Sequence, residues 1–152
     1  MAKQPPKIKR PSWDEYFLQI SDLVSTRATC SRLHVGAILV RDRMIISTGY
    51  NGSPRKTDQC DEVGCRIVNG HCARVVHAEA NAVTQAAYHG ISTKEATLYT
   101  RYLPCEHCTK ILINAGIEKI VYREVYENID QPYTKELLRQ AKVKLAKLPK
   151  KK

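Results

Sequence analysis

Two short stretches carry the side chains that most restrict the fold of this chain. They are His77-Ala78-Glu79 and Pro104-Cys105-Glu106-His107-Cys108, and each opens a segment predicted to be helical. Cys105 and Cys108 are three residues apart, so both thiols point the same way, and the positive end of the helix dipole favours their thiolate form. One imidazole and two thiolates make a zinc site whose fourth position stays open, as catalytic zinc requires. The fold must therefore bring two helix starts together.

Glu79 and His77 each have a simpler interpretation when they are considered alone. A carboxylate is favoured in the first turn of a helix by the dipole, and a lone histidine is often a partly buried polar residue. Beside an open metal position, however, Glu79 can exchange protons with a zinc-bound water as acid and base. The two cysteines favour this second interpretation. His107 lies off their shared face and is expected at the surface.

The remaining pattern predicts an α/β fold. Ser12 and Glu15 form a capping-box signature, followed by apolar residues at helical spacing. Two β-rich runs within residues 35–52 surround Asp42-Arg43 and predict a hairpin. Helices are then expected from about residue 77 to 89, at 104–115 and at 134–141, alternating with strands at 96–100, 119–122 and 142–148. Gly90 and Gly116 are expected to end the first two of these helices. The polar, cysteine-rich residues 52–72 resist assignment.

The charge is concentrated at the two ends of the chain. Residues 1–10 contribute +4 and residues 135–152 contribute +7 to the net charge of +10, which leaves −1 for residues 11–134. Basic ends are more often solvated than specific, so we expect no dedicated nucleic-acid recognition. No apolar run approaches a membrane span, and the N-terminal residues do not resemble a signal peptide. The expected location is the cytoplasm.

The pattern H-x-E…P-C-x-x-C is the signature of zinc-dependent nucleobase deaminases. Several further stretches resemble the deoxycytidylate (dCMP) deaminases, namely "SWDEYF", "RATCSRLHVGAILV", "STGYNGSP", "CDEVGC", "GHCARVVHAEANAV" and "LPCEHCTKILINAGIEKIVY". The resemblance covers roughly residues 12–125. It implies the cytidine deaminase-like three-layer sandwich, a mixed five-stranded sheet with helices on both faces. It also implies a homohexamer activated by dCTP and inhibited by dTTP, with Mg²⁺ accompanying the nucleotide effector.

The same resemblance implies the reaction and the residues that perform it. Zinc held by His77, Cys105 and Cys108 would acidify a water, and Glu79 would move its protons as dCMP becomes dUMP and ammonia, a step that feeds thymidylate synthesis. Asn51 would contact the deoxyribose, and Ala78 would also contact the substrate. For the phosphate, Arg74 is only a candidate.

Further cysteine and histidine residues precede the catalytic histidine, among them Cys30, Cys60, Cys65, His71 and Cys72. Six cysteines in a chain without signs of secretion favour metal binding over disulfides. Some relatives in the resembled family carry a closed structural zinc in this region. The predicted ligands are Cys30, Cys60, His71 and Cys72, with Cys65 as the alternate. Such a metal would order a loop that buries little apolar area, although Cys30 alone could also be an ordinary buried thiol.

One deaminase domain is expected over residues 12–148, between a basic N-terminal segment at 1–11 and a basic tail at 149–152. Three other functions remain open from the sequence. A tRNA adenosine deaminase shares the signature but needs a basic surface around its site. A deaminase of free nucleosides is another alternative within the enzyme class. A non-catalytic zinc module that binds nucleic acid through its ends would have no use for Glu79.

Overall fold

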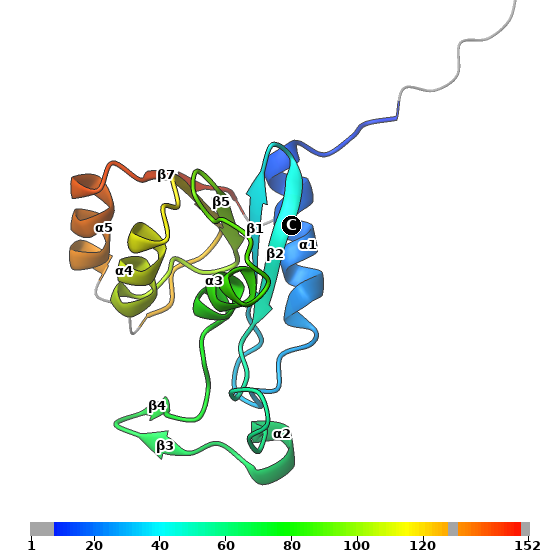
Figure 1. The fold of residues 1–152 in the computed structure, drawn as a ribbon, viewed down its shortest axis with the longest axis vertical. Helices are drawn as coiled ribbons and strands as arrows, with labels where there is room; N and C mark the ends of the chain where they lie inside the picture. Colours follow the sequence, from blue (N-terminus) through cyan, green and yellow to red (C-terminus); the bar gives the residue numbers. More distant parts are fainter. Residues whose placement is uncertain (1–7, 128–130, 150–152) are drawn as a thin grey trace, which may run out of the picture.

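A mixed five-stranded sheet forms the centre of the computed structural model, which describes residues 8–127 and 131–149 (Figure 1). The strand order is β2-β1-β5-β6-β7, and β1 pairs antiparallel with β2 and β5, whereas β5, β6 and β7 run parallel. The elements in chain order are α1 Trp13–Ser25, β1 Gly36–Arg41, β2 Met44–Tyr50, α2 Cys60–Val63, β3 Ile67–Val68, β4 His71–Cys72, α3 Ala78–Tyr88, β5 Thr97–Thr100, α4 Glu106–Asn114, β6 Lys119–Tyr122, α5 Gln131–Gln140 and β7 Lys144–Lys147. The predicted mixed sheet is confirmed.

Helices cover both faces of this sheet and bury two apolar clusters. Helix α1 packs Phe17 and Leu18 against Ile38, Tyr99 and Val121 on one face. On the other face α3, α4 and α5 contribute side chains such as Ala82, Leu112 and Leu138 to a larger cluster with the strands. The result is the three-layer arrangement that the sequence predicts. Within the described residues, no helix has the length and apolarity needed to cross a membrane.

Several element boundaries follow from local chemistry. The Ser12 hydroxyl caps α1 by accepting a hydrogen bond from the Glu15 amide at 3.2 Å. Asp42 and Arg43 both have positive φ, which gives the β1–β2 turn the twist that a two-residue hairpin favours. Gly90 and Gly116 follow α3 and α4 with φ of 67° and 77°, a conformation in which glycine is unstrained. The prediction for residues 1–7 and 150–152, the outermost parts of the basic ends, lies outside the described residues.

Residues 52–72 form a small unit beside the sheet. It contains the one-turn helix α2 and the two-stranded hairpin of β3 and β4, which lie together at one end of the molecule (Figure 1). The exposed apolar side chains Val63, Ile67 and Val68 show how little of this unit is buried. Its order therefore depends on contacts other than an apolar core.

The close approach of β2 to α3 fixes the position of the helix that follows His77. A Cβ on Gly49 would collide with the backbone of Ala78 and Ala82, so no larger residue fits without displacement. Two hydrogen bonds hold the same contact. The Ser47 hydroxyl donates to the Ala82 carbonyl at 2.7 Å, and the side-chain amide of Asn81 donates to the Tyr50 carbonyl at 2.8 Å. The start of α3 is thereby held against the end of β2.

Replacing Gly49 with alanine should therefore destabilise the fold. Because the added methyl group meets backbone and not a flexible side chain, we expect a loss of about 2–3 kcal/mol in the free energy of unfolding, measured by urea denaturation. Thr48→Ala, at an exposed position of the same strand, is the control and should change this free energy by less than about 0.5 kcal/mol. Equal stability of the two variants would contradict the inferred collision.

Candidate metal centre and cleft

The segments that carry the predicted site residues meet at one edge of the sheet. Strands β2 and β5 both end there, and the chain leaving β2 reaches Asn51 while the chain leaving β5 reaches Cys105. Paired backbone hydrogen bonds between Gly52 and Val76 bring the approach to α3 to the same place. Ligands often bind outside the carboxyl ends of strands in α/β sheets.

His77, Cys105 and Cys108 form a compact group at this edge. The Nδ1 atom of His77 lies 3.5 Å from the sulfur of Cys105 and 3.5 Å from the sulfur of Cys108. All three ligand-type atoms lie within 4.8 Å of one another. The exposure increases from the buried Cys108 through the half-buried Cys105 to the exposed His77. The group is thus anchored in the protein on one side and open on the other.

This group has the dimensions of a zinc site. At the usual bond lengths, a nitrogen and a sulfur bound to one tetrahedral zinc lie roughly 3.5 Å apart. Of its two cysteines, Cys105 favours the deprotonated form that zinc binds, whereas the hydrogen bond with Cys105 and burial raise the pKa of Cys108. The hydrogen bond from Cys108 lowers the pKa of Cys105 to about 3, and the hydrogen bond to Cys105 raises the pKa of His77 to about 9. The residues therefore fit a metal ion with one position left for another ligand.

Glu79 is buried beside this group. Glu79 is only 6% exposed, and the Cys108 thiol donates a hydrogen bond to its Oε2 atom at 3.9 Å. Burial raises the pKa of the Glu79 carboxyl, because the charged form loses its hydration. A carboxyl group with a raised pKa next to an open metal position is suited to accept and return protons near neutral pH.

The backbone explains how two residues so close in sequence reach the same place. His77 is the N-cap of α3 and has extended dihedral angles, with φ −68° and ψ 151°. It therefore precedes the helix, whereas Glu79 lies in the first turn. The expected helical start at about His77 is one residue early. Because His77 is extended and not helical, the side chains of His77 and Glu79 can reach the same place without sharing a helix face.

A cleft of about 190 Å³ adjoins the group. The predicted site residues in its lining are His77, Ala78, Glu79, Cys105 and Asn51, so the fold brings them together. Arg74 is not part of the lining. Sequence reasoning missed several other lining residues that leave no periodic signal; they are Arg32, Leu33, Val35, Gly70, Val75, Tyr102, Leu103 and Tyr126. Among these, only Arg32 brings a permanent charge. His107 is exposed, as expected.

Asn51 organises the wall of this cleft. Its side-chain oxygen accepts a hydrogen bond from the Val35 amide at 2.8 Å, and its side-chain nitrogen donates to the Leu33 carbonyl at 2.7 Å. Asn51 is 6% exposed, so these bonds are made where water does not readily replace them. The side chain retains one further N–H for another partner, since an amide nitrogen has two.

A second group consists of Cys60, Cys65 and Cys72. Their sulfur atoms lie within 4.8 Å of one another, and those of Cys60 and Cys72 are 3.6 Å apart, too far for a disulfide. Two thiolates on one tetrahedral zinc are separated by roughly 3.8 Å, so this group also fits a metal. The Ser31 hydroxyl, 3.4 Å from the sulfur of Cys65, lowers the pKa of that thiol to about 7.

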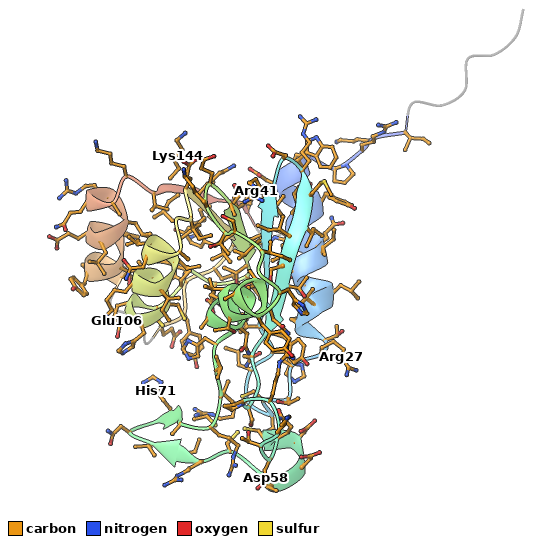
Figure 2. All side chains as sticks on the ribbon, in the orientation of Figure 1. Arg27, Arg41, Asp58, His71, Glu106 and Lys144 are labelled. Carbon is orange, nitrogen blue, oxygen red and sulfur yellow. The ribbon has the colours of Figure 1, made fainter. Side chains whose placement is uncertain are left out.

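The predicted ligands Cys30 and His71 stand outside this three-thiol group. Cys30 is buried, precedes Ser31 in the chain and lines the cleft together with Cys72. His71 is exposed on the hairpin, and Figure 2 shows it on the side facing the start of α4, where Glu106 is labelled. The alternate ligand Cys65 therefore belongs to the three-thiol group. His71 is outside that group and lines the cleft.

Comparison with known proteins gives consistent matches. The family model "Cytidine and deoxycytidylate deaminase zinc-binding region" matches residues 11–124. ComE operon protein 2 of Bacillus subtilis (strain 168) is 43% identical over 136 residues, covering 90% of this chain and 71% of that protein. The deoxycytidylate deaminase of Saccharomyces cerevisiae is 34% identical over 86% of this chain, which spans only 44% of the yeast protein. The dCMP deaminase of cyanophage S-TIM5, crystallised with dCMP and dUMP, is similar with a TM-score of 0.79 and 29% identity, covering 93% of this chain and all of that one.

The hydrogen bonds of Asn51 predict a measurable stability effect. Asn51→Leu keeps the approximate volume but leaves the Val35 amide and the Leu33 carbonyl unpaired, so the free energy of unfolding should fall by about 2–4 kcal/mol. Asn81→Leu, which loses a single bond at a more exposed position, should cost about 1 kcal/mol. Urea denaturation of both variants checks this order, and a smaller loss for Asn51→Leu would refute it.

Proposed function

Since this chain belongs to the cytidine and deoxycytidylate deaminase family, we propose that it hydrolyses dCMP to dUMP and ammonia and so supplies a precursor for thymidylate synthesis. The observation that carries this proposal is the placement of His77 Nδ1 3.5 Å from both cysteine sulfurs, beside a cleft that also holds the buried Glu79. His77, Cys105 and Cys108 are the proposed zinc ligands. The fit of their spacing to tetrahedral geometry supports this assignment.

The proposed reaction depends on proton transfers by Glu79. Zinc bound at this site supplies Lewis-acid chemistry, which makes water acidic enough to react at neutral pH. Glu79 accepts a proton from the attacking water and delivers it to ring nitrogen 3 while the water oxygen bonds to carbon 4. It then carries the second proton to the departing amine, so that dUMP and ammonia balance dCMP and water. Burial of Glu79 supports this role, because its raised pKa brings proton gain and loss closer to balance.

The cleft offers contacts for the rest of the substrate. Asn51 is the proposed partner of the deoxyribose, through the N–H that its bonds to Leu33 leave free. Ala78, buried between His77 and Glu79 and part of the cleft lining, is the proposed contact for the reacting end of the base. Leu33, Val35 and Tyr102 add apolar surface, which suits a flat pyrimidine ring.

A second, structural zinc is proposed at Cys60, Cys65 and Cys72. The three thiols are close enough for one ion, and Cys30 is the proposed fourth ligand, because it is buried next to Ser31, which contacts Cys65. Four thiolates would close the site, as in structural zinc centres. This ligand set differs from the one that the sequence favours, in that Cys65 takes the place of His71.

The proposals for assembly and regulation come from the family resemblance, and the proposal for location comes from the free cysteines. We expect a homohexamer, which is carried over from the family resemblance. Activation by dCTP with Mg²⁺ and inhibition by dTTP are carried over from the family resemblance. Six free thiols favour a reducing compartment, so we propose a cytoplasmic enzyme.

The proposed role of Glu79 can be tested by separating catalysis from metal binding. Glu79→Gln should lower kcat for dCMP by about 10²–10⁴-fold, because the amide cannot move protons, while the zinc content stays at the wild-type value. Glu106→Gln is the matched control, since this carboxylate is also in the first turn of a helix but outside the cleft lining. It should keep its activity within about threefold. Activity of Glu79→Gln within about tenfold of wild type, at full zinc content, would remove Glu79 from the mechanism.

The second metal makes a prediction about stoichiometry. Purified protein should contain two zinc ions per chain, and Cys65→Ser should reduce this number to one and lower stability. His71→Gln should retain two, because the imidazole is exposed outside the thiol group, whereas the proposed fourth ligand Cys30 is buried next to Ser31. Elemental analysis of the three proteins decides between Cys65 and His71 as a ligand. Loss of one zinc from His71→Gln but not from Cys65→Ser would restore the ligands favoured by the sequence.

A further inference from the structure

Cys72 and Cys60 place an accessible thiol in contact with a buried one. Cys72 is half-buried and lines the cleft, whereas Cys60 is 2% exposed at the start of α2. Both are free thiols, and their sulfur atoms are 3.6 Å apart. A small oxidant that enters the cleft therefore meets Cys72 first, and a second thiol already touches the sulfur that it oxidises.

The unit that carries both thiols can adjust to a shorter contact between them. A disulfide is about 2.0 Å long, so the two sulfurs must approach by about 1.6 Å. Cys72 is in a two-stranded hairpin whose other strand has the exposed side chains Ile67 and Val68, and α2 has a single turn. Both elements lie at the same end of the molecule (Figure 1). Segments with so little apolar burial shift at low cost in free energy.

The two cysteines of the group with His77 are held more firmly. Cys108 is in α4, which packs its buried side chains Thr109 and Leu112 into the domain. The Nδ1 atom of His77 also contacts both sulfurs, at 3.5 Å each. The shift that a disulfide needs is therefore easier in the three-thiol group than in the group with His77.

We propose that Cys72 and Cys60 form an oxidation site, at which a hydroperoxide converts the two thiols into a disulfide. The Cys72 sulfur attacks the O–O bond of hydrogen peroxide and becomes a sulfenic acid, and one water leaves. The Cys60 sulfur then attacks the Cys72 sulfur, and the hydroxyl group leaves as a second water with the Cys60 proton. Two thiols are oxidised and one peroxide is reduced. This chemistry goes beyond the proposed deamination and does not depend on it.

The disulfide would affect both the metal and the cleft. A sulfur in a disulfide no longer supplies the thiolate that zinc binds, so a zinc ion held by the three-thiol group would be released. The new bond would also pull on β4 and on Gly70 in the hairpin turn. The Gly70 carbonyl accepts a hydrogen bond from Arg32 at 3.0 Å, and both residues line the cleft. Oxidation should therefore change the shape of the cleft wall.

The test oxidises the zinc-loaded protein and maps its cysteines. The full chain is treated with hydrogen peroxide, and its peptides are analysed by mass spectrometry without reduction. The expected product is a disulfide between Cys60 and Cys72, with one zinc ion released per disulfide, measured with a chromogenic chelator. For dCMP, kcat/KM should fall roughly 10–100-fold, because small displacements around a reacting substrate are costly. Dithiothreitol with added zinc should restore it.

Two variants separate the roles of the thiols. Cys65→Ser is the matched control, because it also removes a thiol of the group but keeps the contact between Cys60 and Cys72. It should still form the disulfide. Cys60→Ser should instead stop at the sulfenic acid of Cys72, which dimedone traps as a stable adduct.

The peptide map also decides against the inference if it fails. A disulfide between Cys105 and Cys108, a disulfide that includes Cys65, or a Cys72 thiol left unmodified would each overturn it. A Cys60–Cys72 disulfide without loss of zinc would support the oxidation site and refute the second metal. An unchanged kcat/KM in the oxidised protein would refute the effect on the cleft. Failure of untreated, zinc-loaded protein to convert dCMP would refute the proposed function alone.

Discussion

The contact of His77 with two cysteines requires the starts of α3 and α4 to be held at one edge of the sheet. Neither helix could satisfy this requirement alone, because the three side chains come from two segments separated by β5. The absence of a Cβ at Gly49 lets α3 approach β2, and the bonds from Ser47 and Asn81 hold it there. Helix α4 begins shortly after β5, so the sheet itself positions Cys105 and Cys108. The packing of the whole domain thus supports a group of three ligand atoms.

The two cysteine groups differ in a way that follows from their surroundings. The group with His77 is open to a cleft and lies beside a buried carboxyl group, which suits a reacting metal. The group of Cys60, Cys65 and Cys72 joins α2 to the hairpin, in a unit with little apolar burial, which suits a structural metal. Cys72 belongs to the second group and also lines the cleft. A metal that orders residues 52–72 would therefore also shape the site where the substrate binds.

Local patterns predicted much of this structure, because the interactions behind them join residues close in sequence. The cap of α1 at Ser12 spans three residues, the β1–β2 turn is set by Asp42 and Arg43, and the signature at His77 and Cys105 follows from ligand chemistry. The conformation of residues 52–72 and the position of Arg32 depend instead on contacts between distant segments. The sulfur of Cys65 meets Ser31, and Arg32 meets Gly70, and neither contact leaves a periodic trace in the sequence. For the same reason, the sequence alone could not decide whether His71 or Cys65 is the better candidate ligand of the second metal.

The most direct test of this account is a comparison of substrates with zinc-loaded protein. Release of ammonia and the identity of the product would be measured with dCMP, deoxycytidine, cytidine and a tRNA anticodon hairpin. The expected result is conversion of dCMP to dUMP, with a kcat/KM at least roughly 100-fold above that for the two nucleosides and no reaction of the hairpin. Preference for the tRNA hairpin, or no conversion of dCMP by protein that holds its zinc, would contradict it.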